Sequence, residues 1–337
     1  MNIWEAADKH RKILIRRDTA TLRRLRALYD GAQKRIEEKL KALELQMLAR
    51  EAAGEVVTDG WLRMQQRYYD LYDQVQAEMR KLSAEGAQLT RAAQADVVPM
   101  GNAHAIAQIE LQASIAFNRL PVEALEAFAG LSSNGSPLAA LFNEFGAATA
   151  TKLQSTLFSG IATGQGAKET ARQLREFLDG NRARALTIAR TETTRAYRLA
   201  GQRTMEASGI VTGKRRVTAK SLRTCAACLA TDNHIYPLSA EIDAHVNCRC
   251  VFVAIVDPRI RRLAIPERET GEQWLRRQSE ADQIKVLGIA GAKAYRGREL
   301  PLRAWVGETR SAKWGLQRAQ RSLKQAREAA RVEVPTL

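Results

Sequence analysis

The chain has 337 residues, with 53 Lys and Arg against 37 Asp and Glu and a formal net charge of +16. This length allows about two domains and buries a hydrophobic core, which excludes a small protein that depends on disulfides. No stretch approaches the roughly 20 apolar residues that span a bilayer, and the charged N-terminus lacks the apolar run of a secretory signal. We therefore expect a soluble protein of a reducing cytosol, with no membrane partner.

The positive charge favours a polyanion or an acidic protein surface as partner. The excess is uneven, because residues 258–337 hold 18 Lys and Arg against 9 Asp and Glu. We expect contact with nucleic acid first in this C-terminal region. A solvated surface without a partner is the alternative that net charge leaves open.

The N-terminal third has the pattern of two long helices. Apolar or small residues recur at steps of three and four, which places them on one stripe of each helix. The stripes are Leu22, Leu25, Tyr29, Ala32, Ile36, Leu40, Leu43 and Met47, and then Met64, Tyr68, Leu71, Val75, Met79 and Leu82. The stretch GEVVTDG (54–60), with a glycine at each end, predicts the turn of a helical hairpin. We expect the stripes to pack within the chain, and an oligomer contact is the alternative.

Breaker residues divide the middle of the chain. The stretch VVPMGN (97–102) predicts a helix break, and LSSNGSP (131–137) predicts a loop. The segment ATGQGAKETARQLREFL (162–178) predicts a helix that ends at the Asp-Gly pair after it. A further helix is predicted over about 184–207, closed by Gly209.

Beyond this glycine the pattern changes to that of strands. Lys214–Ala219 and Cys250–Val256 are short, rich in β-branched residues and predict two strands. From Pro258 onward the chain returns to basic helical segments, with a terminal helix predicted over 312–333. The expected fold is mainly α with a small α+β core: a long N-terminal helical hairpin, then helices packed on a short antiparallel sheet.

All four cysteines lie in one window of 28 residues, 223–250, between the two predicted strands. A CxxC pair precedes an HxxCxC group by 16 residues, and two such clusters facing each other are typical of a tetrahedral structural Zn²⁺ site. Four ligands are needed and five candidates are present, so the sequence leaves open which one stays out. The candidates are Cys225, Cys228, His245, Cys248 and Cys250.

Other interpretations of this window are disulfides or thiols without a ligand. A catalytic zinc ion would keep an open position and have an acid or base nearby. Asp232, Glu241 and Asp243 lie in the window, but without a diagnostic spacing. His234 is a weaker sixth candidate, which we expect on the surface. We expect a closed structural site whose metal contributes to the folding free energy.

Three blocks occur in an order that resembles a known family. They are IARTETTRAY (188–197), TCAACLATDNHIYPL (224–238) and HVNCRC (245–250). Together they resemble the head morphogenesis domain of tailed bacteriophages, found in phage Mu F-like minor head proteins, and the resemblance covers about 161–306. Asn233 stands where the family commonly has glycine, and asparagine also tolerates a left-handed turn. SAEIDA (239–244) replaces the family's proline-rich approach to the histidine.

Helical periodicity in the first 150 residues and the resemblance beyond them together predict three regions. Residues 1–100 would form a helical hairpin or coiled-coil-like arm. Residues 101–257 would form the head morphogenesis domain with the zinc-fastened loop 223–250, and residues 258–337 a basic helical region.

The ARTE block has its own prediction. Spacing allows Arg190 to pair with Thr194 and Glu192 to pair with Arg195, with Thr191 between them. We interpret Arg190, Thr191, Glu192 and Arg195 as a polar network that docks their helix on the sheet. A catalytic Glu192, by analogy with transferases that use Arg and Glu, is the alternative, although the chain has no nucleotide-binding loop.

The resemblance implies a non-enzymatic minor head protein in the virion, near the portal vertex, assembled in the host cytoplasm. Its partners would be the portal protein, the major capsid protein, or both, and double-stranded DNA bound without sequence preference. Several copies per virion are possible. The alternative is an enzyme, either a zinc-dependent nuclease or an ADP-ribosyltransferase-like protein. A host DNA-binding protein with a zinc module is a third interpretation, but no recognition helix is visible.

Overall fold

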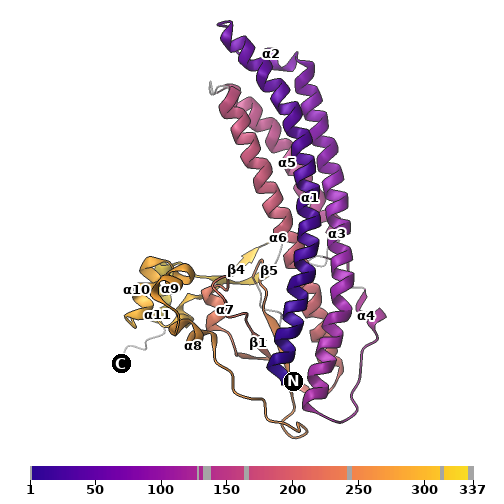
Figure 1. The fold of residues 1–337 in the computed structure, drawn as a ribbon, viewed down its shortest axis with the longest axis vertical. Coiled ribbons are helices and arrows are strands. Elements are labelled where there is room, and N and C mark those ends of the chain that lie inside the picture. The colour runs from indigo at the N-terminus through magenta and orange to yellow at the C-terminus, as the bar shows by residue number, and fades with distance from the viewer. Residues whose placement is uncertain are drawn as a thin grey trace. The chain divides into compact units, whose positions relative to one another are not determined.

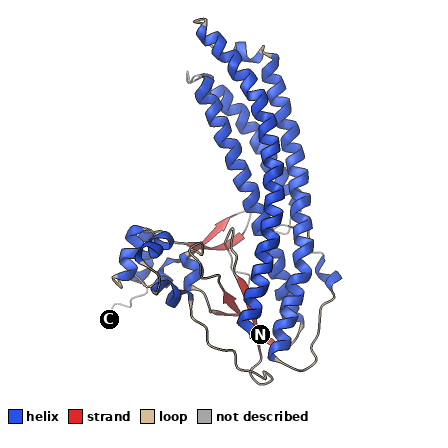
Figure 2. Ribbon diagram, in the orientation of Figure 1, coloured by secondary structure: helices blue, strands red, loops and turns tan. Residues whose placement is uncertain are grey.

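The structure is a computed structural model that describes residues 2–126, 129–131, 138–162, 167–240, 245–311 and 315–332. The fold is mainly helical with two small antiparallel sheets (Figures 1 and 2), as the sequence predicts. None of the helices in these ranges combines the length and apolar character that a membrane span requires.

Long helices dominate the first two thirds of the chain. They are α1 (Ile3–Ala52), α2 (Asp59–Arg63), α3 (Gln66–Gln112), α4 (Val122–Glu126), α5 (Leu138–Ala162) and α6 (Ala167–Ala207). The remaining elements are shorter: β1 (Val211–Val217), α7 (Ala226–Ala230), β2 (Ile235–Pro237), β3 (Val251–Val256), α8 (Gly271–Arg276), α9 (Glu280–Leu287), α10 (Ile289–Arg296), the 3₁₀ helix η1 (Leu302–Trp305), β4 (Val306–Ser311), β5 (Gly315–Gln320) and α11 (Leu323–Val332).

The chain forms two compact units that are each discontinuous in sequence. The first contains Met1–Arg17, Gln94–Ala129 and Thr194–Leu337, and the second contains Asp18–Ala93 and Gly130–Thr193. Each unit combines separate segments of the chain, whereas the sequence analysis expects three contiguous regions. The functional boundaries at residues 100 and 257 stay predictions.

The predicted hairpin is present as α1 and α3, which run antiparallel within the second unit. Arg35 of α1 donates two hydrogen bonds to Glu78 of α3, at 2.5 and 2.8 Å. Every stripe residue on α1 is buried, and so are those on α3 from Tyr68 to Leu82. The prediction that the stripes pack within the chain is therefore confirmed. Met64, which is 76% exposed, is the exception, because it caps α2 and precedes α3.

Two predicted helix breaks are wrong. Helix α3 continues through Pro99, and α6 continues through Asp179 and Gly180. A proline inside a helix costs about 3 kcal/mol, but the adjacent Val97 and Val98 are both fully buried in the core. Packing therefore outweighs the local preference. The predicted loop 131–137 and the glycines before α6 lie largely outside the described residues.

Gly101 serves a close helix crossing in the first unit. A Cβ atom at this position would lie 2.2 Å from the carbonyl oxygen of Tyr197 and 3.2 Å from Cβ of Ala200, both on α6. The glycine that predicts a helix break thus allows α3 and α6 to approach each other.

The three-stranded sheet has the order β2-β1-β3, and both pairings are antiparallel. The register of β1 and β3 runs from Val211 opposite Val256 to Val217 opposite Val251. The structure therefore confirms the two predicted strands and adds β2, which is too short to give a sequence pattern.

The C-terminal region departs from the predicted helical segments. Residues 315–320 form β5, which pairs with β4 so that Arg318 lies opposite Glu308, whereas the sequence predicts a helix over 312–333. Only α11 of that helix is present in the described residues. Gln317 and Arg318 are buried in the hairpin, and this tertiary burial overrides the helical propensity of the segment.

Helix α7 joins this region to the sheet. Its residues Ala226 and Leu229 belong to the same hydrophobic cluster as Leu275, Leu302 and Trp305.

Two glycine substitutions test whether Gly101 is required for the close approach of α3 and α6. Gly101→Ala should lower the free energy of unfolding by about 1–3 kcal/mol, because its methyl group collides with backbone of α6. Gly180→Ala is the matched control, since a Cβ there meets nothing within 4 Å. It should stabilise the helix by about 0.5–1 kcal/mol. Urea denaturation followed by circular dichroism measures both. Equal effects of the two substitutions would contradict this account.

Candidate metal centre

The cysteine window begins and ends at elements of secondary structure. Cys225 is the N-cap of α7, and its Sγ accepts a hydrogen bond from the backbone N–H of Cys228 at 3.4 Å. Cys250 directly precedes β3, and Cys248 follows a turn in which Asn247 has φ of +63°. The antiparallel pairing of β1 with β3 returns the second cluster to the first.

The structure brings all five predicted candidates together around Cys228. Nε2 of His245 lies 3.3 Å from Sγ of Cys225 and 3.1 Å from Sγ of Cys228. Sγ of Cys228 lies 3.9 Å from Sγ of Cys248, and Cys228 also groups with Cys248 and Cys250 within 4.8 Å. Zn–S bonds of about 2.3 Å in a tetrahedron place two sulfur atoms about 3.8 Å apart. The separation of Cys228 and Cys248 matches this value, and the two groups of donors that share Cys228 could hold a metal ion.

All four cysteines carry free thiols, so the structure contains none of the disulfides considered above. Cys228, Cys248 and Cys250 are buried, and Cys225 is partly exposed. The burial of the donors agrees with the expected closed structural site rather than with one open to a substrate.

A hydrogen bond orients the ring of His245 for metal binding. Its Nδ1 lies 2.6 Å from the carbonyl oxygen of Val246, so Nδ1 carries the hydrogen as donor. The other nitrogen, Nε2, then presents its lone pair to the thiols. A backbone carbonyl on the outer nitrogen is the usual way in which a metal-binding histidine is oriented.

Two buried arginines support the cluster. Nη2 of Arg216, on β1, donates to Sγ of Cys228 at 3.3 Å and Sγ of Cys248 at 3.5 Å. Arg198, on α6, donates through Nε to the carbonyl of Cys250 and through Nη2 to that of Cys248, both at 2.8 Å. A guanidinium beside two sulfurs favours their thiolate form, which is the form that binds metal.

Hydrogen bonds within the cluster set its proton affinities. The hydrogen bond with Cys228 is the main reason that the pKa of Cys225 falls to about 4, while the pKa of Cys228 rises. Burial lowers the pKa of His245, but hydrogen bonds with Cys225 and Cys248 outweigh it and raise this pKa to about 10. A bound metal ion would displace protons from Cys228 and His245, so its affinity should fall in acid.

The remaining polar residues of the window have other positions. Asp232 is buried and its Oδ1 accepts a hydrogen bond from the Thr218 backbone N–H at 2.8 Å, with Lys220 and Arg268 at 3.7 and 3.8 Å. It therefore fixes the turn after β1. His234 is exposed, as predicted. Asn233 has φ of +70°, which confirms the left-handed turn. Glu241 and Asp243 lie outside the described residues.

The ARTE residues lie on α6. Nε of Arg190 pairs with Oδ2 of Asp18 at 3.0 Å, and Oγ1 of Thr191 donates to the Thr187 carbonyl at 2.7 Å. Glu192 is 1% exposed, and Arg195 is half-buried.

Docking of α6 on the sheet uses residues that the sequence analysis missed. Arg198 binds the approach to β3, as described above. Lys214 of β1 is 1% exposed and donates to Oε1 of Gln202 at 2.7 Å and to the carbonyls of Leu238 and Ala240. One feature of the sequence could have indicated these residues. Lys214 and Arg216 are two positions apart on β1, so both side chains lie on the same face of the strand.

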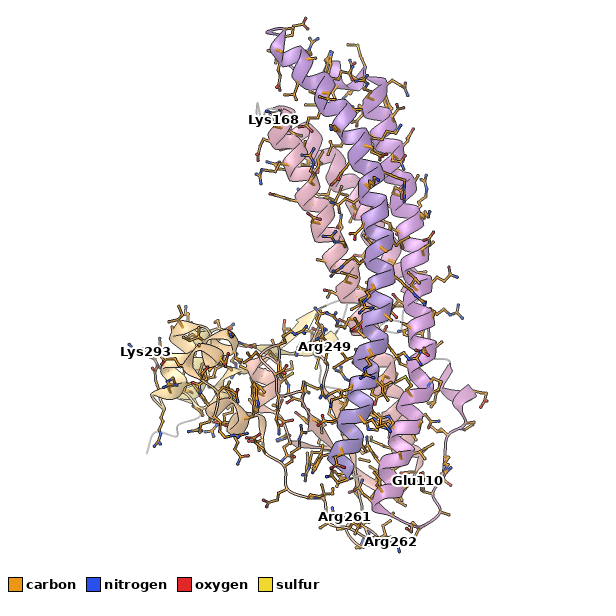
Figure 3. All side chains as sticks on the ribbon, in the orientation of Figure 1. Glu110, Lys168, Arg249, Arg261, Arg262 and Lys293 are labelled. Carbon is orange, nitrogen blue, oxygen red and sulfur yellow. The ribbon has the colours of Figure 1, made fainter. Side chains whose placement is uncertain are left out.

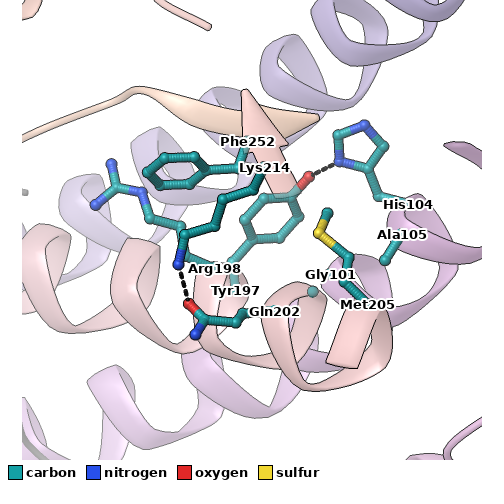
Figure 4. A pocket seen from close by; sticks show the side chains of 10 residues that line it. Gly101, His104, Ala105, Tyr197, Arg198, Gln202, Met205, Lys214 and Phe252 are labelled. Atoms are coloured by element: carbon teal, nitrogen blue, oxygen red, sulfur yellow. Dashed lines mark hydrogen bonds between the residues drawn. The ribbon is translucent and has the colours of Figure 1, made fainter. Parts of the chain in front are cut away.

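A small cavity lies beside Lys214 (Figure 4). Its walls include His104, Tyr197 and Phe252, and its volume of about 20 Å³ suits one water molecule rather than an organic ligand. His104 contacts the Tyr197 hydroxyl, and burial lowers the pKa of this histidine to about 3. Burial also lowers the pKa of Lys214 to about 8. The cavity is therefore part of the core that supports the metal loop.

Cys228 belongs to two groups of possible ligands, one with Cys225 and His245 and the other with Cys248 and Cys250. This shared position generates a prediction. Among single substitutions of the five candidates by serine or, for His245, by alanine, Cys228→Ser should cause the greatest loss of metal affinity. The fifth candidate can replace a lost outer ligand, but no other side chain belongs to both groups. Competition with a chromophoric chelator measures the affinities. A larger loss from any of the other four substitutions would contradict this arrangement.

Comparison with known proteins agrees with this geometry. The model of the family described as Phage Mu protein F like protein matches residues 151–253, a range that ends within β3 just after the last cysteine. No curated protein and no solved structure matches the chain. The match covers the C-terminal half of α5, all of α6, the cysteine window and β1, and it supports a phage head morphogenesis domain. Over residues 151–253 this chain is therefore similar to the family described as Phage Mu protein F like protein.

Proposed function

We propose that this chain is a minor head protein of a tailed bacteriophage that acts in head morphogenesis at or near the portal vertex. The observation that carries this proposal is the F-like domain, in which the matched segment ends on the buried cluster around Cys228. The protein would be a virion component present in several copies. It would assemble in the host cytoplasm through contacts with the portal protein, the major capsid protein, or both.

A structural rather than enzymatic role has physical support. Glu192, the candidate catalytic residue of the ARTE block, has an exposed fraction of 1%. A catalytic group must contact its substrate, and a side chain this deeply buried suits a packing role. The cavity beside Lys214 is also too small for a nucleotide.

Mass spectrometry of purified virions tests the proposed function. The expected result is a few copies of this chain per particle, measured against the major capsid protein, together with co-purification with the portal protein from infected cells. Absence from mature particles and from portal complexes would contradict the proposal and favour an enzymatic or host-directed role.

The metal of the cluster is proposed to be Zn²⁺ in a structural role. Four donors drawn from thiolate and imidazole groups, buried and close to tetrahedral spacing, are the set that zinc prefers in structural sites. The ion would fasten α7 and the approach to β3 against β1. Four of the five residues Cys225, Cys228, His245, Cys248 and Cys250 would supply its ligands, and the ion itself would supply no chemistry beyond this cross-link.

Metal analysis of protein purified without added zinc tests this role. We expect close to one equivalent of zinc per chain, and a lower melting temperature after removal of the ion with a chelator, because metal binding contributes to folding. Less than about half an equivalent with the thiols reduced would contradict the zinc site. An unchanged melting temperature after complete removal would contradict its structural role.

A further inference from the structure

The first half of α1 is rich in positive charge. Residues 9–29 include eight Lys and Arg and a single acidic residue, Asp18. Asp18 is 4% exposed and pairs with Arg190, so it does not offset charge at the surface.

Seven of these eight basic side chains are exposed, and Arg11 is buried. Within the parts of the chain that the structure describes, six of the seven form no ion pair, whereas Arg11 pairs with Asp8 and the exposed Arg17 pairs with Asp96. We call the six residues the α1 basic face: Lys9, Lys12, Arg16, Arg23, Arg24 and Arg26.

Helix geometry places most of this face on one side of α1. Lys9, Lys12, Arg16, Arg23 and Arg26 follow one another at steps of three, four, seven and three, and Arg24 lies at the edge of the same face. From the first to the last the helix rises about 25 Å. Since all six belong to one continuous helix, α1 (Figure 1), their spacing depends on that helix alone.

The C-terminal region, where nucleic-acid contact was expected first, differs in this respect. Some of its exposed basic side chains, such as Lys293 (labelled in Figure 3), form no ion pair with a described residue, but many others pair with an acidic side chain. The pairs are Arg259 with Asp257, Arg276 with Glu272, Arg277 with Glu269, Lys285 with Asp282 and Arg327 with Glu299. Each pair already neutralises the charge that a polyanion would use.

We propose that the α1 basic face binds the phosphate backbone of double-stranded DNA without reading its sequence. An extended row of cations without counter-charges matches a polymer whose negative charge repeats evenly along its length. An acidic protein is a weaker match, because protein interfaces have an apolar centre and none of the large apolar side chains between residues 9 and 29 is exposed. The inference rests on the proposed role as a head protein, for which the sequence analysis expects contact with DNA, and gives that contact a location.

Titration of a fluorescent 25-base-pair duplex with the full chain, at several salt concentrations, tests the proposal. Two triple variants, K9Q/K12Q/R16Q and R23Q/R24Q/R26Q, each remove half of the face and keep good helix-forming residues. The matched control is R259Q/R276Q/R277Q, which removes the same charge from exposed but paired arginines. Circular dichroism checks that each variant stays folded.

We expect each α1 triple variant to bind DNA about tenfold more weakly or worse, and the slope of log K against log salt to become shallower by about 2 to 3. The control should bind within about twofold of the unmodified chain. Equal losses in all three variants would mean that only net charge matters and would overturn the proposal. Loss of portal binding with DNA binding intact would assign the face to an acidic protein instead. Virion mass spectrometry is independent of these outcomes, so the role as a head protein can hold while this surface assignment fails.

Discussion

The convergence of five donor side chains on Cys228 is the constraint on which this part of the fold depends. Cys228 lies on α7, while its neighbours His245 and Cys248 come from the segment that leads into β3. The same short helix contributes Ala226 and Leu229 to the hydrophobic cluster built with α8, α10 and η1. A five-residue helix has little stability of its own. Its position therefore depends on the cluster on one side and on the apolar core on the other.

Buried cations make up the second layer around this cluster. Arg198 and Lys214 donate mainly to backbone carbonyls, and Arg216 donates to two sulfurs. Burying such groups costs several kcal/mol each unless their hydrogen bonds are satisfied. Segments without secondary structure, such as 238–240 and 248–250, leave carbonyls unpaired and so provide acceptors. The irregular loop and the buried cations are thus complementary.

The sequence predicts the parts of this protein that are periodic or local. The stripes on α1 and α3, the two strands and the turn at Asn233 follow from spacing and residue type, and so does the meeting of the five Cys and His residues. Pro99 and β5 could not be predicted in this way, because long-range burial overrides a local preference at each of them. The exposed Gly180 is also inside a continuous helix, where the sequence pattern predicts an end. The roles of Arg198 and Arg216 were missed for a related reason. Their partners lie between 12 and 52 residues away in the chain, and composition gives no sign of a guanidinium that is buried.

The register of β1 and β3 has a consequence for the entropy of the unfolded chain. Pairing of Val217 with Val251 closes a loop of about 34 residues, whereas Cys228 and Cys248 are 20 residues apart and lie inside it. Once the inner pair is joined, only about 14 residues remain to be ordered between the strand ends. Because the entropic cost of closing a loop grows with the logarithm of its length, the shorter loop lowers the free-energy cost of pairing the two strands by about 0.8 kcal/mol. A chain that binds its metal early would therefore form this sheet faster than one that binds it late, so the supply of metal during synthesis becomes a kinetic variable of folding.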